Sequence, residues 1–346
     1  MSTKTYAESG VSHEQDQKWL EKLKQAHPAV LGDLQKKVKS NLGAYAAVYA
    51  LSDEKWIATC CDGVGTKLLW TLAGLGRYED LAQDLLAMNA NDLLCVGARP
   101  LLFLDYMAIG SADLLGDGAP MDKFITGLRQ ACAKTAQLLV GGETAQMPDL
   151  YQKDHFDLAG FSIGELAKEE YLDASRIEEG ASVWGWTSSG PHSNGYTWLR
   201  KLFDQKQDAD FIKKELMQPT RLYVNEVAAL KKLMGTEVDS LQGFFHMTGG
   251  GLNNLLRLAR PDDSAFGFDL CDWPKQDPLW VQAVREKSGA SEKELFASFN
   301  MGFGMLCVLQ KDWAKNNQVA LQALGLCELG KVTSEKTVKC RDLCFA

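Results

Sequence analysis

The sequence predicts an α/β fold made of two α/β domains. The chain has 346 residues, more than one hydrophobic core usually holds. Short apolar runs alternate with amphipathic segments, which is typical of strands that alternate with helices. Glycine-rich loops follow apolar runs in both halves, at residues 62–67 and 188–195. We therefore expect one domain over residues 1–168 and a second over residues 169–346, with their junction in the acidic stretch 165–179.

Composition narrows the class of protein further. Hydrophobic residues make up 46% of the chain and charged residues 24%, which is ordinary for a globular protein. The net charge of −8 argues against a broad nucleic-acid-binding surface. No apolar stretch reaches the roughly 18 residues of a membrane helix, and residues 1–10 carry no apolar signal-peptide core. Nine scattered cysteines without a CxxC pair favour reduced thiols in the cytoplasm over a zinc site.

In the first domain, apolar residues recur at spacings that predict particular elements. Leu81, Leu85 and Met88 follow the helical period, and a Gly-Ala-Arg-Pro break at residues 97–100 precedes an apolar, strand-like run. We expect the polar residues 89–92 to lie at the end of their helix. We also expect the strand that leads into the double glycine at residues 141–142 to be short and buried. The expected elements are a charged helix over residues 12–40, helices over 78–91 and 121–138, and strands over 56–59, 101–108, 138–140 and 156–163.

The same order of elements repeats in the second domain. Glycine-rich loops at residues 188–195 and 248–251 each precede a segment of helical character, as at the junction of a strand and a helix. The expected elements here are strands over residues 182–186 and 299–309 and helices over residues 196–203 and 252–258.

The loop at residues 62–67 is the first candidate site. It combines a carboxylate, two glycines, a hydroxyl and an ammonium group in six residues. Glycines let backbone N–H groups approach a phosphate closely, lysine neutralises the phosphate, and aspartate can hold Mg²⁺. The spacing is not that of a Walker A loop, and a plain glycine turn with a solvated Asp and Lys stays open as an alternative. The candidate residues are Asp62, Gly63, Gly65, Thr66 and Lys67.

Two further carboxylates follow helical or strand-like segments. Asp92 closes the expected helix over residues 78–91, and Glu143 follows Gly141 and Gly142, a double glycine that lets an acid project into a cleft. Either residue could instead be a helix cap or an exposed acid. Both matter for chemistry if they converge with other carboxylates, because Mg²⁺ prefers oxygen ligands.

The most unusual stretch is Ser-Ser-Gly-Pro-His-Ser-Asn-Gly-Tyr at residues 188–196. Hydroxyls, an imidazole and an amide stand together on a loop that opens a helix, and free N–H groups at a helix start favour an anion such as phosphate. His192 could act as an acid, a base or a donor to a developing oxyanion. His246, Thr248 and three glycines repeat this arrangement at residues 246–251.

The order of these motifs resembles the phosphoribosylformylglycinamidine cyclo-ligase family, also called aminoimidazole ribonucleotide synthetases. Asp-Gly-Val-Gly-Thr-Lys is followed by Asn-Asp, Gly-Gly-Glu-Thr, Ser-Gly-Pro-His-Ser-Asn-Gly-Tyr and His-x-Thr-Gly-Gly-Gly. The resemblance covers most of the chain, from about residue 5 to residue 305. It implies two α/β domains, with the N-terminal domains of a homodimer paired into a β-barrel and a C-terminal α/β sandwich domain.

The resemblance also implies an activity and roles for the residues. ATP would phosphorylate the formamide oxygen of formylglycinamidine ribonucleotide, and ring closure would expel phosphate. Mg²⁺ would be held by Asp62, Asp92 and Glu143. The residues expected to bind ATP are Asp62, Gly63, Gly65, Thr66, Lys67, Gly141, Gly142 and Glu143. The residues expected to bind the substrate are Ser189, His192, Ser193, Asn194, His246, Thr248 and Gly249, with His192, His246 and Asp92 as the catalytic set.

Two departures from the family pattern affect the expected nucleotide contacts. The N-terminal motif has Ala7 where the family usually has lysine, and the glycine-rich loop at residues 42–49 is altered. Three alternatives are therefore kept: thiamine-monophosphate kinase or selenophosphate synthetase of the same superfamily, and a catalytically silent nucleotide-binding homologue. No cysteine precedes Cys60, which disfavours selenophosphate synthetase, and the full 188–196 motif disfavours the kinase.

Overall fold

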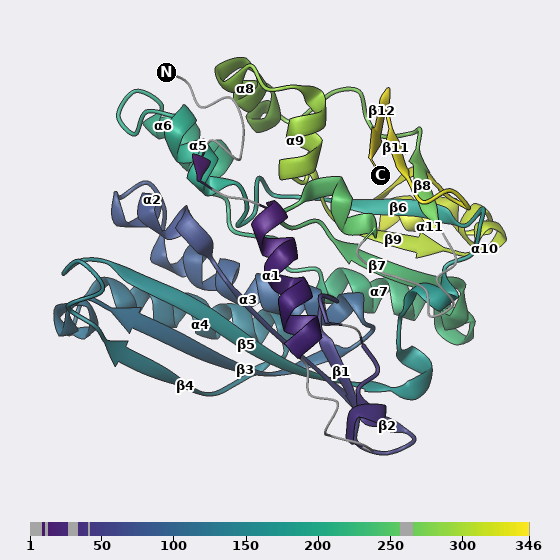
Figure 1. Cartoon of the computed structure of the whole chain (residues 1–346), viewed down its shortest axis with the longest axis horizontal. Helices are drawn as coiled ribbons and strands as arrows, with labels where there is room; N and C mark the ends of the chain where they lie inside the picture. The colour runs from purple at the N-terminus through teal and green to yellow at the C-terminus, as the bar shows by residue number, and fades with distance from the viewer. Residues whose placement is uncertain (1–8, 11–12, 27–33, 41, 257–265, 346) are drawn as a thin grey trace.

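The computed structural model shows two β-sheets with helices packed on them (Figure 1). The first sheet has five strands from the first half of the chain, and the second has seven strands from the second half. Ala7 and the last residues of the helix expected over 252–258 lie outside the described part of the chain. The described residues are 9–10, 13–26, 34–40, 42–256 and 266–345.

The first sheet has the strand order β1-β2-β5-β3-β4, with β3 and β4 parallel and the other pairs antiparallel. Its strands are β1 (Ala47–Ala50), β2 (Lys55–Gly63), β3 (Arg99–Ile109), β4 (Leu138–Gln146) and β5 (Phe156–Ala167). The helices of this half are α1 (His13–Ala26), α2 (Leu68–Leu72), α3 (Tyr78–Cys95) and α4 (Pro120–Thr135), with 3₁₀ turns η3 (Gly65–Lys67), η4 (Ala112–Leu115) and η5 (Lys168–Glu170).

Helix α3 lies between the two halves of the molecule. It packs on α4, β2 and β5 on one side and on β7 and α7 of the second half on the other. Its residues from Asp84 to Cys95 are all buried, which explains why the helix is not amphipathic in the usual sense. Apolar side chains such as Leu85 face the first core, together with Phe103 and Phe124. Of the buried polar residues of α3, Asp84, Asn91 and Asp92 bond to the second half, whereas Asn89 bonds to Asp62 of β2.

The second sheet has the strand order β12-β11-β8-β10-β6-β9-β7. Its strands are β6 (Ser182–Thr187), β7 (Leu241–His246), β8 (Gly267–Leu270), β9 (Phe303–Leu309), β10 (Leu326–Thr333), β11 (Val338–Cys340) and β12 (Leu343–Phe345). The helices are α5 (Tyr196–Leu202), α6 (Ala209–Phe211), α7 (Val224–Met234), α8 (Leu279–Ser288), α9 (Glu292–Ser298), α10 (Lys311–Asn316) and α11 (Gln318–Ala323). The short turns are η6 (Ala174–Arg176), the π-helical η7 (Ile212–Leu216), η8 (Gly235–Ser240) and η9 (Gly251–Leu256).

Several expectations about the elements were wrong: the expected helix over 12–40 does not reach residues 38–40, and the expected strand over 299–309 starts at Phe303. Strand β2 continues through Asp62 and Gly63 because both residues pair with β5, so the expected loop starts later. Residues 89–92 lie inside α3 rather than at its end, since tertiary hydrogen bonds satisfy their side chains. Strand β4 is neither short nor buried: it runs over nine residues that are almost all exposed, because it is an edge strand with only β3 beside it.

The first sheet exposes apolar side chains, both on its edge strand β4 and on the central strand β5. Leu138, Leu139 and Val140 on β4 are 65%, 40% and 52% exposed, and Phe161 on β5 is 41% exposed. An exposed edge strand with apolar residues is a surface on which another strand can pair. No helix in the described part of the chain is long and apolar enough to span a membrane.

Candidate active site

The loop at residues 62–67 packs against the second half of the chain. Gly65 has a φ of +56°, and a Cβ added there would lie 3.9 Å from the Ser193 carbonyl oxygen. The Thr66 hydroxyl lies 2.9 Å from the hydroxyl of Thr197 at the start of α5. The loop predicted to hold phosphate therefore lies directly beside residues 188–195, which we call the histidine loop.

Lys67 is the central cross-link between these two loops. Its fully buried ammonium group donates to Asp84 at 2.8 Å, to the His192 carbonyl at 3.0 Å and to the Gln218 carbonyl at 2.8 Å. These bonds use all three donors of the ammonium group. A phosphate contact of the kind predicted for Lys67 would require one of these bonds to be released.

Asp84 was not predicted as a site residue. It lies on α3, is fully buried, and accepts from the backbone N–H of Thr220 at 2.7 Å and from the Thr220 hydroxyl at 2.6 Å. Burial raises the pKa of Asp84 and lowers the pKa of Lys67, and the attraction between the two groups opposes both shifts. The pair thus bonds to two segments of the second half, around His192 and around Thr220.

His192 has an unusual backbone and a fully buried side chain. Its φ of +61° is left-handed, which costs about 1–2 kcal/mol for a residue with a Cβ. Its Nε2 accepts from the Ser189 N–H at 3.3 Å, and its Nδ1 has no hydrogen-bond partner among the described residues. Burial, followed by the nearby His246, Lys67 and Arg221, holds the pKa of His192 well below its usual value. The imidazole is therefore neutral at pH 7, with the proton on Nδ1, because Nε2 is the acceptor.

His246 stands at the end of β7 and binds two residues of α3. Its Nδ1 lies 2.8 Å from Oδ1 of Asp92, and its Nε2 lies 3.4 Å from Nδ2 of Asn91. A carboxylate only accepts hydrogen bonds, so Nδ1 carries the proton and Nε2 is the acceptor. The rings of His246 and His192 have their centroids 6.5 Å apart. The structure therefore brings together the three residues predicted as the catalytic set.

Asn194 is a half-buried residue whose side-chain donor is buried and unused. Its Nδ2 has no hydrogen-bond partner among the described residues. A Cβ added at Gly249 would lie 3.2 Å from its Oδ1, so the glycine-rich turn comes close to the histidine loop. The Thr248 carbonyl accepts from Asn254 at 3.2 Å, which fixes this turn. Buried donors without acceptors are rare in folded proteins, so those of His192 and Asn194 point to a ligand with acceptor oxygens.

The two serines of the histidine loop are already bonded within the chain. The Ser189 hydroxyl donates to the Pro219 carbonyl at 2.6 Å, and the Ser193 hydroxyl lies 3.1 Å from the Thr220 hydroxyl. Their contacts with substrate remain a prediction. Both bonds join the loop to the segment before α7.

The three carboxylates predicted to hold Mg²⁺ do not come together in one chain. Asp62 pairs across the sheet with Gly160, Gly160 with Asp105, and Asp105 with Gly142. Glu143 on β4 is thus separated from Asp62 on β2 by two intervening strands, about 14 Å at 4.7–4.9 Å per strand. Among the described residues, no group of three or more His, Cys, Asp or Glu side chains could hold a metal ion.

Several residues outside the predicted set also shape the site. Asn300 donates to the Gly190 carbonyl at 2.9 Å and accepts from the Ser188 hydroxyl at 3.1 Å, so it holds the start of the histidine loop. A Cβ at Gly304 would lie 2.3 Å from Cε1 of His192. Polar residues inside an otherwise apolar helix were the available signal for Asp84 and for Asn91, whereas nothing local marks Gly304.

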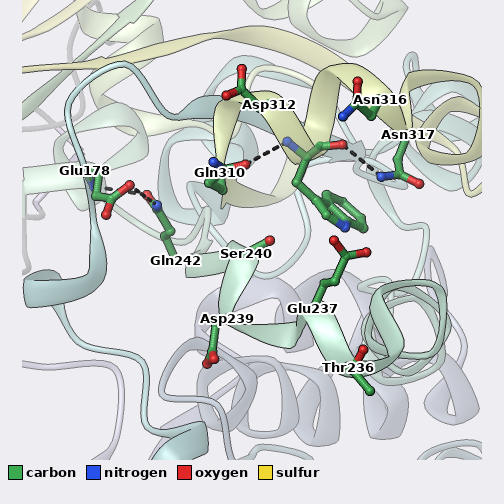
Figure 2. A pocket seen from close by; sticks show the side chains of 11 residues that line it. Glu178, Thr236, Glu237, Asp239, Ser240, Gln242, Gln310, Asp312, Asn316 and Asn317 are labelled. Atoms are coloured by element: carbon green, nitrogen blue, oxygen red, sulfur yellow. Dashed lines mark hydrogen bonds between the residues drawn. The ribbon is translucent and has the colours of Figure 1, made fainter.

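A pocket of about 630 Å³ lies elsewhere, around η8, the start of β7 and helix α10 (Figure 2). Its walls carry four carboxylates and several amides, and none of the predicted site residues lines it. Figure 2 shows Gln242 bonded to Glu178 and the hydrogen bonds of Gln310 and Asn317. We therefore assign the candidate active site to the interface of the two halves, not to this pocket.

Comparison with known proteins places the chain in the class of AIR synthase related proteins. Residues 43–166 match the model "AIR synthase related protein, N-terminal domain", and residues 178–342 match the corresponding C-terminal domain. Among solved structures, a complex described as AaThiL with AMPPCP and TMP is similar with a TM-score of 0.63 at 16% identity, covering 94% of each chain. Thermotoga maritima PurL complexed with FGAR has a TM-score of 0.59 at 15% identity, covering 91% of this chain and 49% of that one.

Curated relatives define the family more closely. A phosphoribosylformylglycinamidine cyclo-ligase from Xanthomonas oryzae is 35% identical over 334 residues, covering 93% of this chain and 94% of the relative. The enzyme of the same name from Fusobacterium nucleatum is 36% identical over 333 residues, with the same coverage. The chain therefore belongs to the phosphoribosylformylglycinamidine cyclo-ligase family, as the order of its motifs predicted.

Proposed function

We propose that this chain closes the imidazole ring of aminoimidazole ribonucleotide in purine biosynthesis. In this reaction ATP transfers its γ-phosphoryl group to the formamide oxygen of formylglycinamidine ribonucleotide. A substrate nitrogen then attacks the activated carbon, the carbon–oxygen bond breaks, and phosphate leaves with ADP as the other product. The similarity to curated cyclo-ligases over 93% of the chain supports this activity.

The observation that carries the proposal is the pair of buried, unpartnered donors on the histidine loop. The Nδ1–H of His192 and the amide of Asn194 lack acceptors within the described residues, and both the formamide oxygen and the transferred phosphoryl group are acceptors. Donors preorganised where negative charge develops commonly supply the largest share of catalysis. We infer that His192 binds as a neutral donor to this oxygen and that Asn194 supports it.

His246 acts as the proton carrier in this proposal. Its Nε2 is the unprotonated nitrogen, because Nδ1 donates to Asp92. A proton taken from the attacking nitrogen would give an imidazolium that the Asp92 carboxylate stabilises. Asp92 therefore acts through His246, and Thr248 with Gly249 lines the substrate side of the same turn.

ATP is proposed to bind beside Asp62 and Gly63 at the end of β2. An ATP-analogue complex is among the similar structures, which supports nucleotide binding to this fold. The residues of one chain do not fit a Mg²⁺ site built from Asp62, Asp92 and Glu143, so we derive no step through the ion. We still expect turnover to require Mg²⁺ as the partner of ATP.

We propose a homodimer paired through the first sheets, as a closed barrel. The support is the exposed edge strand β4 with its apolar side chains, because barrels remove unpaired strand edges. Such pairing would also place β4, and with it Gly141, Gly142 and Glu143, against the partner. The cytoplasm remains the predicted location, supported by nine free cysteines.

A product assay tests the proposed function. Purified protein is given ATP, Mg²⁺ and formylglycinamidine ribonucleotide, and aminoimidazole ribonucleotide, ADP and phosphate are measured. Equal amounts of the three products support the cyclo-ligase. In a parallel reaction with thiamine monophosphate in place of the ribonucleotide, phosphorylation of that compound would identify a kinase. Nucleotide binding without turnover in either reaction would identify a silent homologue.

A further inference from the structure

Lys67 and Asp84 form a buried clamp between the two halves of the chain. We propose that both are positioning residues, which hold the histidine loop in the conformation that presents the His192 imidazole to the substrate. The proposal rests on the proposed function for what His192 does. It replaces a phosphate contact as the reason for a lysine at this position.

The contacts of the clamp are directed at the backbone of the second half. Lys67 donates to the carbonyls of His192 and Gln218, and Asp84 accepts from the backbone and hydroxyl of Thr220. Both charged residues come from the first half, on η3 and α3. One ion pair therefore fixes two segments, at residues 188–195 and 218–220, against each other.

His192 needs this support because little else holds its backbone. Its left-handed φ of +61° is unfavourable, and the single bond to its ring is a 3.3 Å contact from Ser189. The glycine at position 304 leaves room for the ring, since a Cβ there would lie 2.3 Å from Cε1, but it does not hold the ring. The bond from Lys67 to the His192 carbonyl, at 3.0 Å, is the shorter of these two hydrogen bonds and comes from a charged donor.

The burial of the pair also argues for a role in geometry. A fully buried ion pair contributes little net stability, because the cost of removing both charges from water offsets their attraction. An uncharged pair of similar volume would pack the same interface. Strong charge-assisted bonds do, however, define positions tightly, which is what a loop carrying a reacting group needs.

A double-mutant cycle on kcat tests the clamp. Lys67→Met should lower kcat by about 10- to 100-fold, the usual effect of a misplaced group, with KM for ATP nearly unchanged. In a His192→Asn background the same substitution should change kcat less than about threefold, because residues that act as a unit are not additive. Additive effects, or a large rise in KM for ATP, would overturn the proposal and restore a phosphate role.

Two further variants complete the design. Lys67→Met leaves Asp84 as an uncompensated buried carboxylate and could impair folding, so Lys67→Met with Asp84→Asn is measured in the same cycle. Lys231→Met is the matched control: Lys231 also joins the halves, through Gly97 and Glu170, but does not contact the histidine loop. The control should keep its kcat.

Hydrogen exchange gives a readout that does not need turnover. In the Lys67→Met, Asp84→Asn variant, amides of residues 190–195 should exchange about tenfold faster or more, while those of β6 keep their rates. Unchanged exchange in the loop overturns the clamp even if the enzyme is active. If the wild type makes no aminoimidazole ribonucleotide, the proposed function is wrong. The exchange rates of the histidine loop then still test the clamp.

Discussion

Replacement of His192 is the sharpest test of the candidate site. His192→Asn is the suitable change, because asparagine tolerates the left-handed backbone and its shorter side chain withdraws the ring donor. Loss of one donor to a developing oxyanion typically lowers kcat about 10²- to 10³-fold. Affinity for ATP should change little, since in our proposal the imidazole contacts the formamide oxygen and not the nucleotide.

The structure also predicts a small effect of this change on stability. The imidazole makes one 3.3 Å hydrogen bond and leaves Nδ1 unpartnered, so little favourable bonding is lost. Removing a buried, unsatisfied donor offsets the contacts that the smaller side chain gives up. We expect the free energy of unfolding to change by about 1 kcal/mol or less.

Three measurements decide the outcome: steady-state kcat for aminoimidazole ribonucleotide, ATP affinity by calorimetry, and thermal melts. The control is His155→Asn, because His155 is half-exposed and lies between β4 and β5. This variant should leave kcat, ATP affinity and the melting temperature unchanged. If ATP affinity collapses while turnover at saturation survives, His192 belongs to the nucleotide site. If stability falls by several kcal/mol and kcat does not change, the residue is structural.

Three other predictions follow from the same contacts. Burial lowers the pKa of His192 in the folded chain. As the pH is lowered below about 6.5, the unfolded chain therefore binds a proton that the folded chain does not, and the free energy of unfolding should decrease by up to about 1.4 kcal/mol per pH unit. Urea melts should show this pH dependence in the wild type and a weaker one in His192→Asn. Asp92→Asn removes the charge that stabilises protonated His246 and should lower kcat about 10- to 100-fold, as expected for a charged hydrogen bond, with little change in melting temperature; a much lower melting temperature with normal kcat would make Asp92 a structural residue. Val140→Lys on the exposed edge strand should convert a dimer to a monomer in light scattering, and a wild type that is monomeric at micromolar concentration contradicts the dimer.

The sequence was sufficient to predict the α/β class, the family and most strands and helices. Periodicity and glycine-rich junctions mark such elements directly. It was insufficient where the length or exposure of a strand depends on residues distant in the sequence. Strand β2 continues through Asp62 because β5 pairs with it, and β4 is exposed because no strand in the described chain lies beyond it. Pairing of this kind is not encoded in the local pattern.

The candidate site, too, could be predicted from the sequence only in part. The motif around His192 predicted a functional loop, and the structure brings His192, His246 and Asp92 together. The ion pair of Lys67 with Asp84 was not predictable, because a lysine after glycines looks the same whether its partner is a phosphate or a buried aspartate 17 residues away. Only the fold places Asp84 opposite it.

Helix α3 has a consequence for how substrates reach the site. Asp84, Asn91 and Asp92 on this one helix all bind atoms of the second half, while Leu85 belongs to the core of the first half. A hinge motion that separated the two halves would have to break these bonds together, with those of Lys67. Opening by rigid-body rotation would therefore be costly, and we expect substrate entry and product release to use movements of loops around the histidine residues.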